Sequence, residues 1–571
     1  MTMNKHIVRI IISLCVITLS AGCIRETFPK GSTLVKEQVE KSEEALLQML
    51  NGIPAAMMNA GAGGYATKYG FHGDYGIAAV QLATESMLED IAVLGEPGYF
   101  WFSQYHMNIN QGHEYIWCAY FWDIYYKWIK LANDIIGIIG EPDEDTGMEI
   151  RHLLGYAHAY RAMFYLDLAR LYEPKQNTLI PIPDNIKGLT VPIVTEQTTE
   201  KISKNNPRAS REKMYDFIFS DLKKAETYLE DDAFNYTLPS VAAVHGLYAR
   251  AYIELAATYA EYGDPDPETS GITSESAYRK AAEYARMVID ESGRSPLTQA
   301  QWEDPKTGFN DGSSNNAWIW GLTVSSENLS NLIANIAHIS CEARYGYGIW
   351  TQLGVNKALY EQISDEDFRK HSWLDPEMMS YYPYQLAGTA TEQREFLYGS
   401  MYNYPAVAYE SIKFRPADGE INDYTVGNCA DRCLMRIEEM YFIEMEATLA
   451  TEGREEARRL LEEFMQKWRY PSYECDAKTL SDDAFLKEMM LQKRIEFWGE
   501  GILIFDYKRL NMGITRGYEG TNVLSTARFN CTGRSPQWNL VITRGEHQSN
   551  KGIVHPDTNN PDPTGKLEIW E

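Results

Sequence analysis

The sequence predicts a mainly α-helical protein made of tetratricopeptide-like helical hairpins, with a loop-rich insertion between two helical stretches. Apolar residues recur at every third or fourth position over long segments, as on the buried face of a helix. In several of these segments alanine alternates with aromatic residues, which is typical of helix pairs that pack closely. Glycine, proline, asparagine and tyrosine dominate the part between them. We expect a helical scaffold over about 32–290 and 429–515 and a loop-rich region over about 291–428.

The first residues, 1–22, are expected to be a lipoprotein signal peptide. Lys5 and Arg9 precede an apolar run, and the small residues SAG come directly before Cys23. The run is too short for a membrane-spanning helix, which needs about 20 apolar residues. We therefore expect Cys23 to carry a lipid that holds the mature protein, 23–571, at a membrane.

Helical periodicity then recurs along the chain. Ser32 is expected to cap the first helical segment, and Pro174 is expected to end the third. The insertion contains one strand-like stretch, NNAWIWGL at 315–322, in which two tryptophans alternate with other apolar residues. The segments with helical periodicity are 34–50, 121–136, 152–174, 211–229, 241–260, 277–290, 432–450, 455–470 and 485–501.

Charge and composition argue against several classes of site. The net charge of -27, with only short basic runs, argues against nucleic-acid binding, because a phosphate backbone selects clustered lysine and arginine. The 11 histidines are scattered without metal-ligand spacing, so neither a metal nor a cofactor is expected. Cys429 and Cys433 are spaced so that they could bond or bind a metal, but no second pair accompanies them, which favours isolated thiols.

The stretch RIEFWGEGILIFDYKRL, residues 494–510, mixes carboxylates with cations. Glu496 and Glu500 share one face of the predicted helix. Arg494 at the start of this stretch and Lys493 directly before it lower carboxylate pKa values and keep both acids ionised, which favours a structural ion network. Two carboxylates roughly 5 to 10 Å apart also suit glycoside hydrolysis, so a glycosidase that uses Glu496 or Glu500 stays as an alternative.

The same stretch resembles the most specific motif of the SusD-like (RagB/SusD) family of outer-membrane lipoproteins of Bacteroidetes. That motif runs Arg, any residue, Glu, apolar residues, Glu-Gly, an aromatic residue, Asp and a final Arg, and residues 494–509 are similar to it. Further similarities are spread over nearly the whole mature chain. They are Trp122, Tyr126, Ile129, Ala132, Asn133, Arg161, Ala162, Pro207, Arg208, Asp221, Leu222, Ala225, Ala249, Arg250, Asp367, Arg369, Arg436, Glu439 and Glu446.

The resemblance implies a SusD-like fold that forms a single domain over 23–571. It implies a protein without enzymatic activity that binds an oligosaccharide or polysaccharide at the cell surface. The implied partner, which receives the glycan, is a SusC-like TonB-dependent transporter. The implied location is the outer membrane, with a lipid anchor and with the protein facing the cell exterior. A family member that captures a peptide instead of a glycan is the alternative.

Aromatic residues in loops are the candidates for contacts with a sugar, because flat apolar sugar faces stack on aromatic rings. Rings on helical segments, such as Trp122 and Trp128, are expected in the core. The stretch HGDYG at 72–76 offers polar partners for a sugar. For any single loop ring, burial against the helices is an alternative of at least equal weight to contact with a sugar. The candidate ligand-binding residues are Tyr99, Trp101, Tyr345, Tyr347, Trp350, Tyr381 and Tyr382.

Overall fold

A computed structural model describes residues 43–324, 326, 329–377, 386–399, 404–475 and 481–571. The chain divides after Leu46, and the description below concerns Leu47–Glu571. The expected signal peptide and Cys23 lie outside the described residues, as do two of the candidate ligand-binding residues, Tyr381 and Tyr382.

Long helices make up most of the secondary structure, which confirms the prediction of a mainly α-helical protein. Among the described helices, none combines the length and the apolarity that a membrane span requires. The longer helices are α3 (Glu43–Met58), α5 (Ile77–Glu85), α7 (Ile116–Ile139), α8 (Met148–Tyr172), α10 (Arg211–Tyr228), α11 (Val241–Tyr262), α12 (Ser274–Glu291), α17 (Ala390–Tyr398), α19 (Ile437–Thr451), α20 (Arg454–Trp468) and α21 (Asp482–Phe497).

Consecutive long helices pack against one another in the manner of helical hairpins. The order of packing is α7 on α8, α8 on α10, α10 on α11 and α11 on α12. Small residues allow the close approach: Ala277, Ala281 and Ala285 follow one face of α12 and are fully buried. On α11, a Cβ atom at Gly246 would lie 2.2 Å from the sulfur of Met435, so a larger residue there would require the Met435 side chain to move.

Side-chain caps explain where several of these helices begin. The hydroxyl of Ser210 accepts the backbone N–H of Lys213 at the start of α10. Ser240 does the same for Ala243 at the start of α11. Each cap satisfies one of the backbone N–H groups that have no partner in the first turn of a helix. Two of the periodic segments, those of α10 and α11, therefore begin their helices directly after a residue whose side chain caps the first turn.

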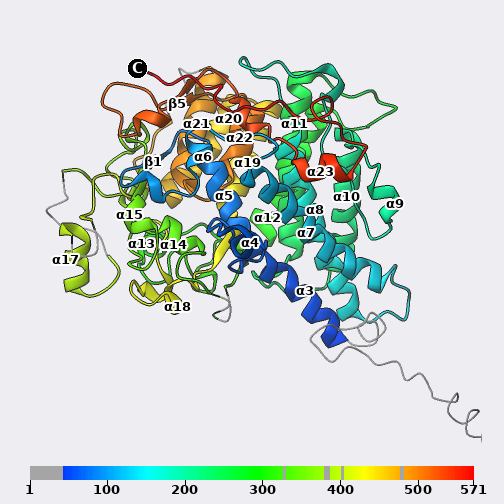
Figure 1. Ribbon diagram of the computed structural model, residues 1–571, viewed down its shortest axis with the longest axis horizontal. Coiled ribbons are helices and arrows are strands. Elements are labelled where there is room, and N and C mark those ends of the chain that lie inside the picture. The colour runs from blue at the N-terminus through cyan, green and yellow to red at the C-terminus, as the bar shows by residue number, and fades with distance from the viewer. Residues whose placement is uncertain (1–42, 325, 327–328, 378–385, 400–403, 476–480) are drawn as a thin grey trace, which may run out of the picture. The chain divides into compact units, whose positions relative to one another are not determined.

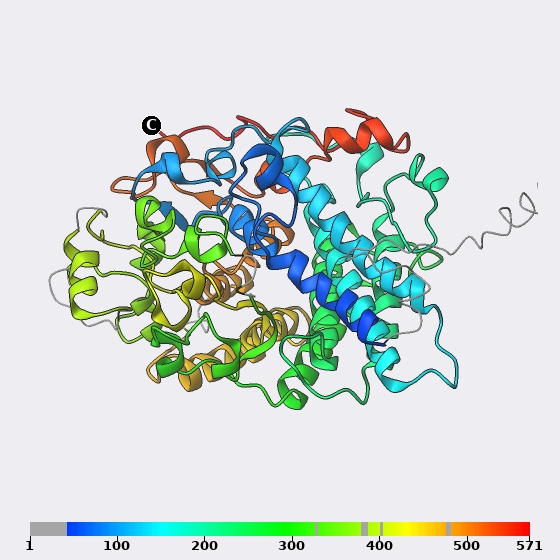
Figure 2. The ribbon, with the colours of Figure 1, turned by 60° about the horizontal axis from the view of Figure 1, so that its bottom comes forward.

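The helical scaffold resumes after the loop-rich region, because α12 packs directly on α19. Helices α20 and α21 pack on α19 in turn, and α22 (Leu503–Arg509) packs on α11 and α5. The residues between α12 and α19 thus leave the scaffold and return to it. Figures 1 and 2 show their short elements, in green and yellow-green, at one side of the scaffold and away from α7, α8 and α10.

Among the described residues, three small antiparallel sheets complete the fold. The strand-like stretch is confirmed as β2 (Trp318–Leu322), but every one of its residues is buried, because it pairs with β4 (Arg432–Arg436) inside the scaffold. The other pairs are β1 (Ile91–Val93) with β3 (Leu353–Val355) and β5 (Ile514–Thr515) with β6 (Asn530–Cys531). The remaining short helices that matter below are η1 (Pro97–Tyr99), α9 (Glu200–Ser203), α14 (Asn335–Ile339), α15 (Gly348–Thr351) and α23 (Arg544–Ser549).

Candidate functional site

Four of the predicted ligand-binding rings gather at one place, which we call the aromatic surface: Tyr99, Trp101, Tyr347 and Trp350, with His72 beside them. The ring centroid of Tyr99 lies 5.1 Å from that of Trp350 and 6.1 Å from that of Tyr347. The ring of Trp101 lies 6.2 Å from Tyr347. Two loops that are far apart in the sequence therefore contribute to one group of rings.

Backbone hydrogen bonds hold these two loops together. The N–H groups of Gly95 and Glu96 donate to the carbonyl oxygens of Thr351 and Trp350, at 2.9 and 2.8 Å. These bonds continue the pairing of β1 with β3 and bring η1 against α15. The rings are thus placed by paired backbone, which is more rigid than an isolated loop.

His72 joins the aromatic surface through both its ring and its backbone. The imidazole is stacked on Trp101 with centroids 4.9 Å apart, and its Nδ1 lies 2.7 Å from the hydroxyl of Tyr347. The carbonyl oxygen of His72 accepts a hydrogen bond of 3.1 Å from Nε2 of His338 on α14. Burial lowers the pKa of His72, and it lowers the pKa of His338 to about 3, so both rings are neutral at neutral pH. The sequence pointed to His72 but gave no sign of His338.

The rings differ in how much they offer to a ligand. Tyr99 is 45% exposed, whereas Tyr347 is only 8% exposed. Trp101, Trp350 and His72 are half-buried. Tyr99 presents the most ring surface to solvent, and the two tryptophans present part of theirs. The buried ring of Tyr347 packs against all three. The group has the flat apolar area on which a sugar face stacks.

Tyr345 lies in different surroundings, although only Gly346 separates it from Tyr347. Its ring packs against a buried cluster of Ile336, Ala343 and Ala430. Burial also raises its pKa. None of the ring contacts found in the described part of the chain joins Tyr345 to the aromatic surface. The geometry therefore gives Tyr345 a packing role.

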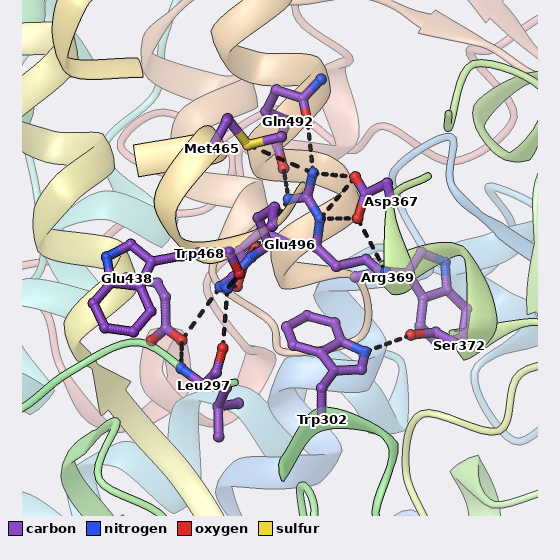
Figure 3. A network of polar contacts seen from close by, with 12 residues as sticks. Leu297, Trp302, Asp367, Arg369, Ser372, Glu438, Met465, Trp468, Gln492 and Glu496 are labelled. Atoms are coloured by element: carbon purple, nitrogen blue, oxygen red, sulfur yellow. Dashed lines mark hydrogen bonds and ion pairs between the residues drawn. The ribbon is translucent and has the colours of Figure 1, made fainter. Parts of the chain in front are cut away.

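The carboxylate of Glu496 lies at the centre of a buried ion network. Arg369, Arg436 and Arg469 each donate a hydrogen bond to it, at 2.9, 2.7 and 2.6 Å. Figure 3 shows Arg369 between Asp367 and Glu496. Burial alone would raise the pKa of Glu496, but the charges of Arg469 and Arg436 outweigh it and hold the pKa well below its ordinary value. Glu496 is fully buried and has no access to a polysaccharide.

Glu500 belongs to the same network. It accepts from Nζ of Lys413 at 2.7 Å and from Nε of Arg436 at 2.9 Å. Burial acts to raise its pKa, but Arg436 and Lys413 lower it overall. A general acid needs a raised pKa and contact with substrate, and neither glutamate has them. The geometry therefore supports the structural ion network and removes the observation on which the glycosidase alternative rested.

Other residues that resemble the family motifs are also contact partners of one another. Arg161 on α8 donates to Asp221 on α10 at 2.7 Å, and its other nitrogen donates to Asn133 on α7 at 2.7 Å. Arg250 donates to Glu439 at 2.6 Å. Similarities that are scattered in the sequence therefore correspond to ion pairs that join neighbouring helices.

Metal binding gains no support from the geometry. The described residues hold no group of histidine, cysteine or carboxylate side chains arranged to bind a metal ion. Cys429 and Cys433 are both half-buried free thiols. Their surroundings agree with the prediction of isolated thiols.

Comparison with known proteins gives two family matches. The family described as "Starch-binding associating with outer membrane" matches residues 72–253, and the family described as "SusD family" matches residues 343–553. Together the two matches include the loop of Tyr99 and Trp101, the loop of Tyr347 and Trp350, and the ion network. The comparison with curated proteins found no relative of the chain.

Solved structures of proteins from Bacteroides and Parabacteroides share this fold. A SusD-like carbohydrate-binding protein from Bacteroides vulgatus is 19% identical, with a TM-score of 0.64, and the match covers 90% of this chain and 98% of that one. Surface glycan-binding protein A from Bacteroides fluxus is 15% identical, with a TM-score of 0.60 and coverage of 91% and 99%. At these identities the likeness shows the fold.

Proposed function

The chain belongs to the SusD-like family, and from this premise we propose that it captures an oligosaccharide or polysaccharide without cleaving it. The observation that carries the proposal is the aromatic surface, in which Tyr99, Trp101, Tyr347 and Trp350 meet. Relatives of the same fold are named for carbohydrate and surface glycan binding.

The arrangement of the aromatic surface suits a sugar. The faces of pyranose rings are apolar and flat, and the 45% exposed ring of Tyr99 offers a matching face to solvent. The half-buried imidazole of His72 lies beside these rings and matches the hydroxyl groups of a sugar in hydrogen-bonding capacity. The ligand contacts are therefore assigned to these rings rather than to the ion network.

The wider setting of the proposal rests on the family. We propose that Cys23 carries a lipid, that the protein lies on the outer face of the outer membrane, and that it passes its glycan to a SusC-like TonB-dependent transporter. The leader and cysteine of the sequence support the anchor. Family membership supports the transporter.

Binding without cleavage is the first expected result. Incubation of the mature protein with a glycan that it binds should release no reducing ends, because Glu496 and Glu500 are buried and held ionised by arginine and lysine. A reducing-sugar assay over many hours checks this. Turnover that disappears in Glu500→Gln but persists in the surface variant Glu456→Gln would restore the glycosidase alternative.

Removal of exposed rings should weaken binding without unfolding the protein. We expect Tyr99→Ala and Trp101→Ala each to cost about 0.5–1.5 kcal/mol of glycan binding, a loss of roughly 2- to 13-fold in affinity. Calorimetric titration and the unfolding midpoint are measured together. The control is Tyr398→Ala on α17, which removes a ring that is 60% exposed but lies in no ring contact among the described residues.

Removal of a ring in the core should instead lower the stability of the protein. Trp122 is 3% exposed, so Trp122→Ala should lower the free energy of unfolding by about 3–5 kcal/mol. If Tyr99→Ala and Trp101→Ala bind normally, the site lies elsewhere. If they unfold like Trp122→Ala, the aromatic surface is part of the core.

A further inference from the structure

A second concave site lies apart from the aromatic surface, between α7, the segment 192–206 and α23. It is a cleft of about 1480 Å³, and we call it the lysine cleft. Figures 1 and 2 show α23, in red, beside the paired helices α7 and α8. None of the aromatic-surface residues lines the cleft. Its volume exceeds the roughly 300–1,000 Å³ typical of small-molecule sites, so a chain of several sugar rings fits it better than a single ring.

The charge of this cleft is opposite to that of the whole chain. Five lysines and three carboxyl groups line it, whereas the chain carries a net charge of -27. The lysines come from all three walls of the cleft. They are Lys127, Lys130, Lys201, Lys204 and Lys551.

Two of these lysines differ from the others in the contacts of their ammonium groups. Lys204 pairs with Glu200 at 2.5 Å, and Lys130 pairs with Asp134 at 2.5 Å. Within the part of the chain that the structure describes, the ammonium groups of Lys201 and Lys551 take part in no hydrogen bond or ion pair, and both residues are exposed. They are therefore free to receive an anionic ligand.

The carboxyl groups of the cleft are already engaged. Asp123 accepts a hydrogen bond of 2.5 Å from the hydroxyl of Tyr65, and Glu546 accepts one of 2.7 Å from Asn550. Glu200 is the partner of Lys204. Burial raises the pKa of both Asp123 and Glu546. The carboxyl groups thus have partners other than Lys201 and Lys551.

The floor of the cleft is aromatic. The rings of Trp122 and Tyr126 lie 4.8 Å apart on α7. The hydroxyl of Tyr126 donates to the carbonyl oxygen of Pro192 at 2.7 Å, which fixes the ring against the neighbouring wall. Tyr126 is half-buried, so part of its ring faces the cleft. A sugar ring placed on it would bring its substituents toward the lysines on the rim.

We propose that the lysine cleft binds a carboxylated oligosaccharide, a segment of a glycan that contains uronic acids. The inference rests on the proposed function for its sugar class, and on Lys201 and Lys551 for its charge. Ammonium groups pair with carboxylates, and the aromatic floor accepts the apolar face of the same sugar. The cleft thus adds a site for acidic sugars to a protein whose aromatic surface carries no cation.

The test uses oligogalacturonate of about six residues and its fully methyl-esterified form as a neutral match. We expect the acid to bind and to weaken several-fold between 50 and 300 mM salt, because exposed charge pairs are screened. The double variant Lys201→Ala/Lys551→Ala should lose at least tenfold in affinity for the acid. The matched control, Lys213→Ala/Lys223→Ala, removes two exposed lysines of α10 and should bind like the unchanged protein.

The outcomes separate this inference from the proposed function. Unchanged binding of the acid by Lys201→Ala/Lys551→Ala, or loss of it in Trp101→Ala, would overturn the lysine cleft as the site. Tighter binding of poly-glutamate than of oligogalacturonate would overturn its sugar class. Neutral glycans bound at the aromatic surface, with no binding of the acid, would leave the proposed function standing and overturn this inference alone.

Discussion

Glu496→Ala is expected to lower the free energy of unfolding by about 3–5 kcal/mol. Glu496 is fully buried, and its carboxylate accepts hydrogen bonds from Arg369, Arg436 and Arg469. Without it, three guanidinium groups face one another in the interior with one anion fewer among them. The electrostatic cost of unpaired buried charge, more than the loss of packing, sets this magnitude.

Chemical denaturation followed by circular dichroism measures the effect. The matched control is Glu456→Ala on α20, whose carboxylate pairs with Arg459 at the surface and should change stability by less than about 1 kcal/mol. Glu496→Gln keeps the shape and removes the charge, so it should be destabilising as well. A Glu496→Ala variant as stable as the control would mean that the arginines find other anions or water.

Acidification is expected to destabilise the protein steeply below about pH 4.5. Burial alone would raise the pKa of Glu173, but the charges of Lys175 and Arg211 lower it from 4.5 to about 2. Ion pairs also lower the pKa values of Glu496, Glu500 and Asp506. A lowered pKa gives stability that is present above the unfolded-state pKa and is lost as the pH falls through the folded-state value. Glu173 alone accounts for about 3 kcal/mol.

Two buried carboxyl groups oppose this trend at higher pH. Burial raises the pKa of Glu85 and of Glu410 to about 8. In these groups the folded state holds a proton that the unfolded state has lost above about pH 4.5, so stability falls as the pH rises from there toward 8. The unfolding free energy should therefore be greatest at mildly acidic pH.

Denaturation curves recorded from pH 3 to pH 9 check both the loss of stability in acid and the loss of stability toward pH 8. Glu85→Gln tests the loss toward pH 8, because the amide cannot ionise. It still offers an acceptor for the N–H of Gly501, which lies 2.8 Å from the carboxyl oxygen. This variant should gain stability relative to the unchanged protein at pH 8 and show little gain at pH 4. A flat profile over the whole range would contradict the ion pairing described for Glu173 and Glu496.

The helical scaffold could be predicted from the sequence because its signal is local. Periodicity lies within single segments and was sufficient to indicate the helices, and local side-chain caps such as Ser210 and Ser240 stabilise their starts. The existence of an ion network could also be predicted, because cations and acids alternate in the stretch 494–510. The cations that take part in it could not be predicted, since Arg369, Lys413 and Arg436 come from other segments.

The aromatic surface could be predicted only in part. Loop position singled out Tyr99 and Tyr347, but their meeting depends on hydrogen bonds between residues 94–96 and 350–352, which leave no trace in either local pattern. The same reasoning could not separate Tyr345 from Tyr347, which lie two residues apart and face different surroundings. The lysine cleft could not be predicted from the sequence at all, because its walls come from three distant segments.

The direct packing of α12 on α19 has a consequence for how ligand preference diversifies in such a protein. Because the chain leaves the scaffold after α12 and re-enters it at α19, the intervening residues form a cassette that can change while the helical frame stays closed, provided that it keeps Arg369, Lys413 and Arg436 as partners of Glu496 and Glu500. The cassette is not self-sufficient, since β3 within it pairs with β1 outside it. A chimera that transfers the ligand preference of one homologue to another must therefore exchange two segments together, residues 91–101 and the cassette.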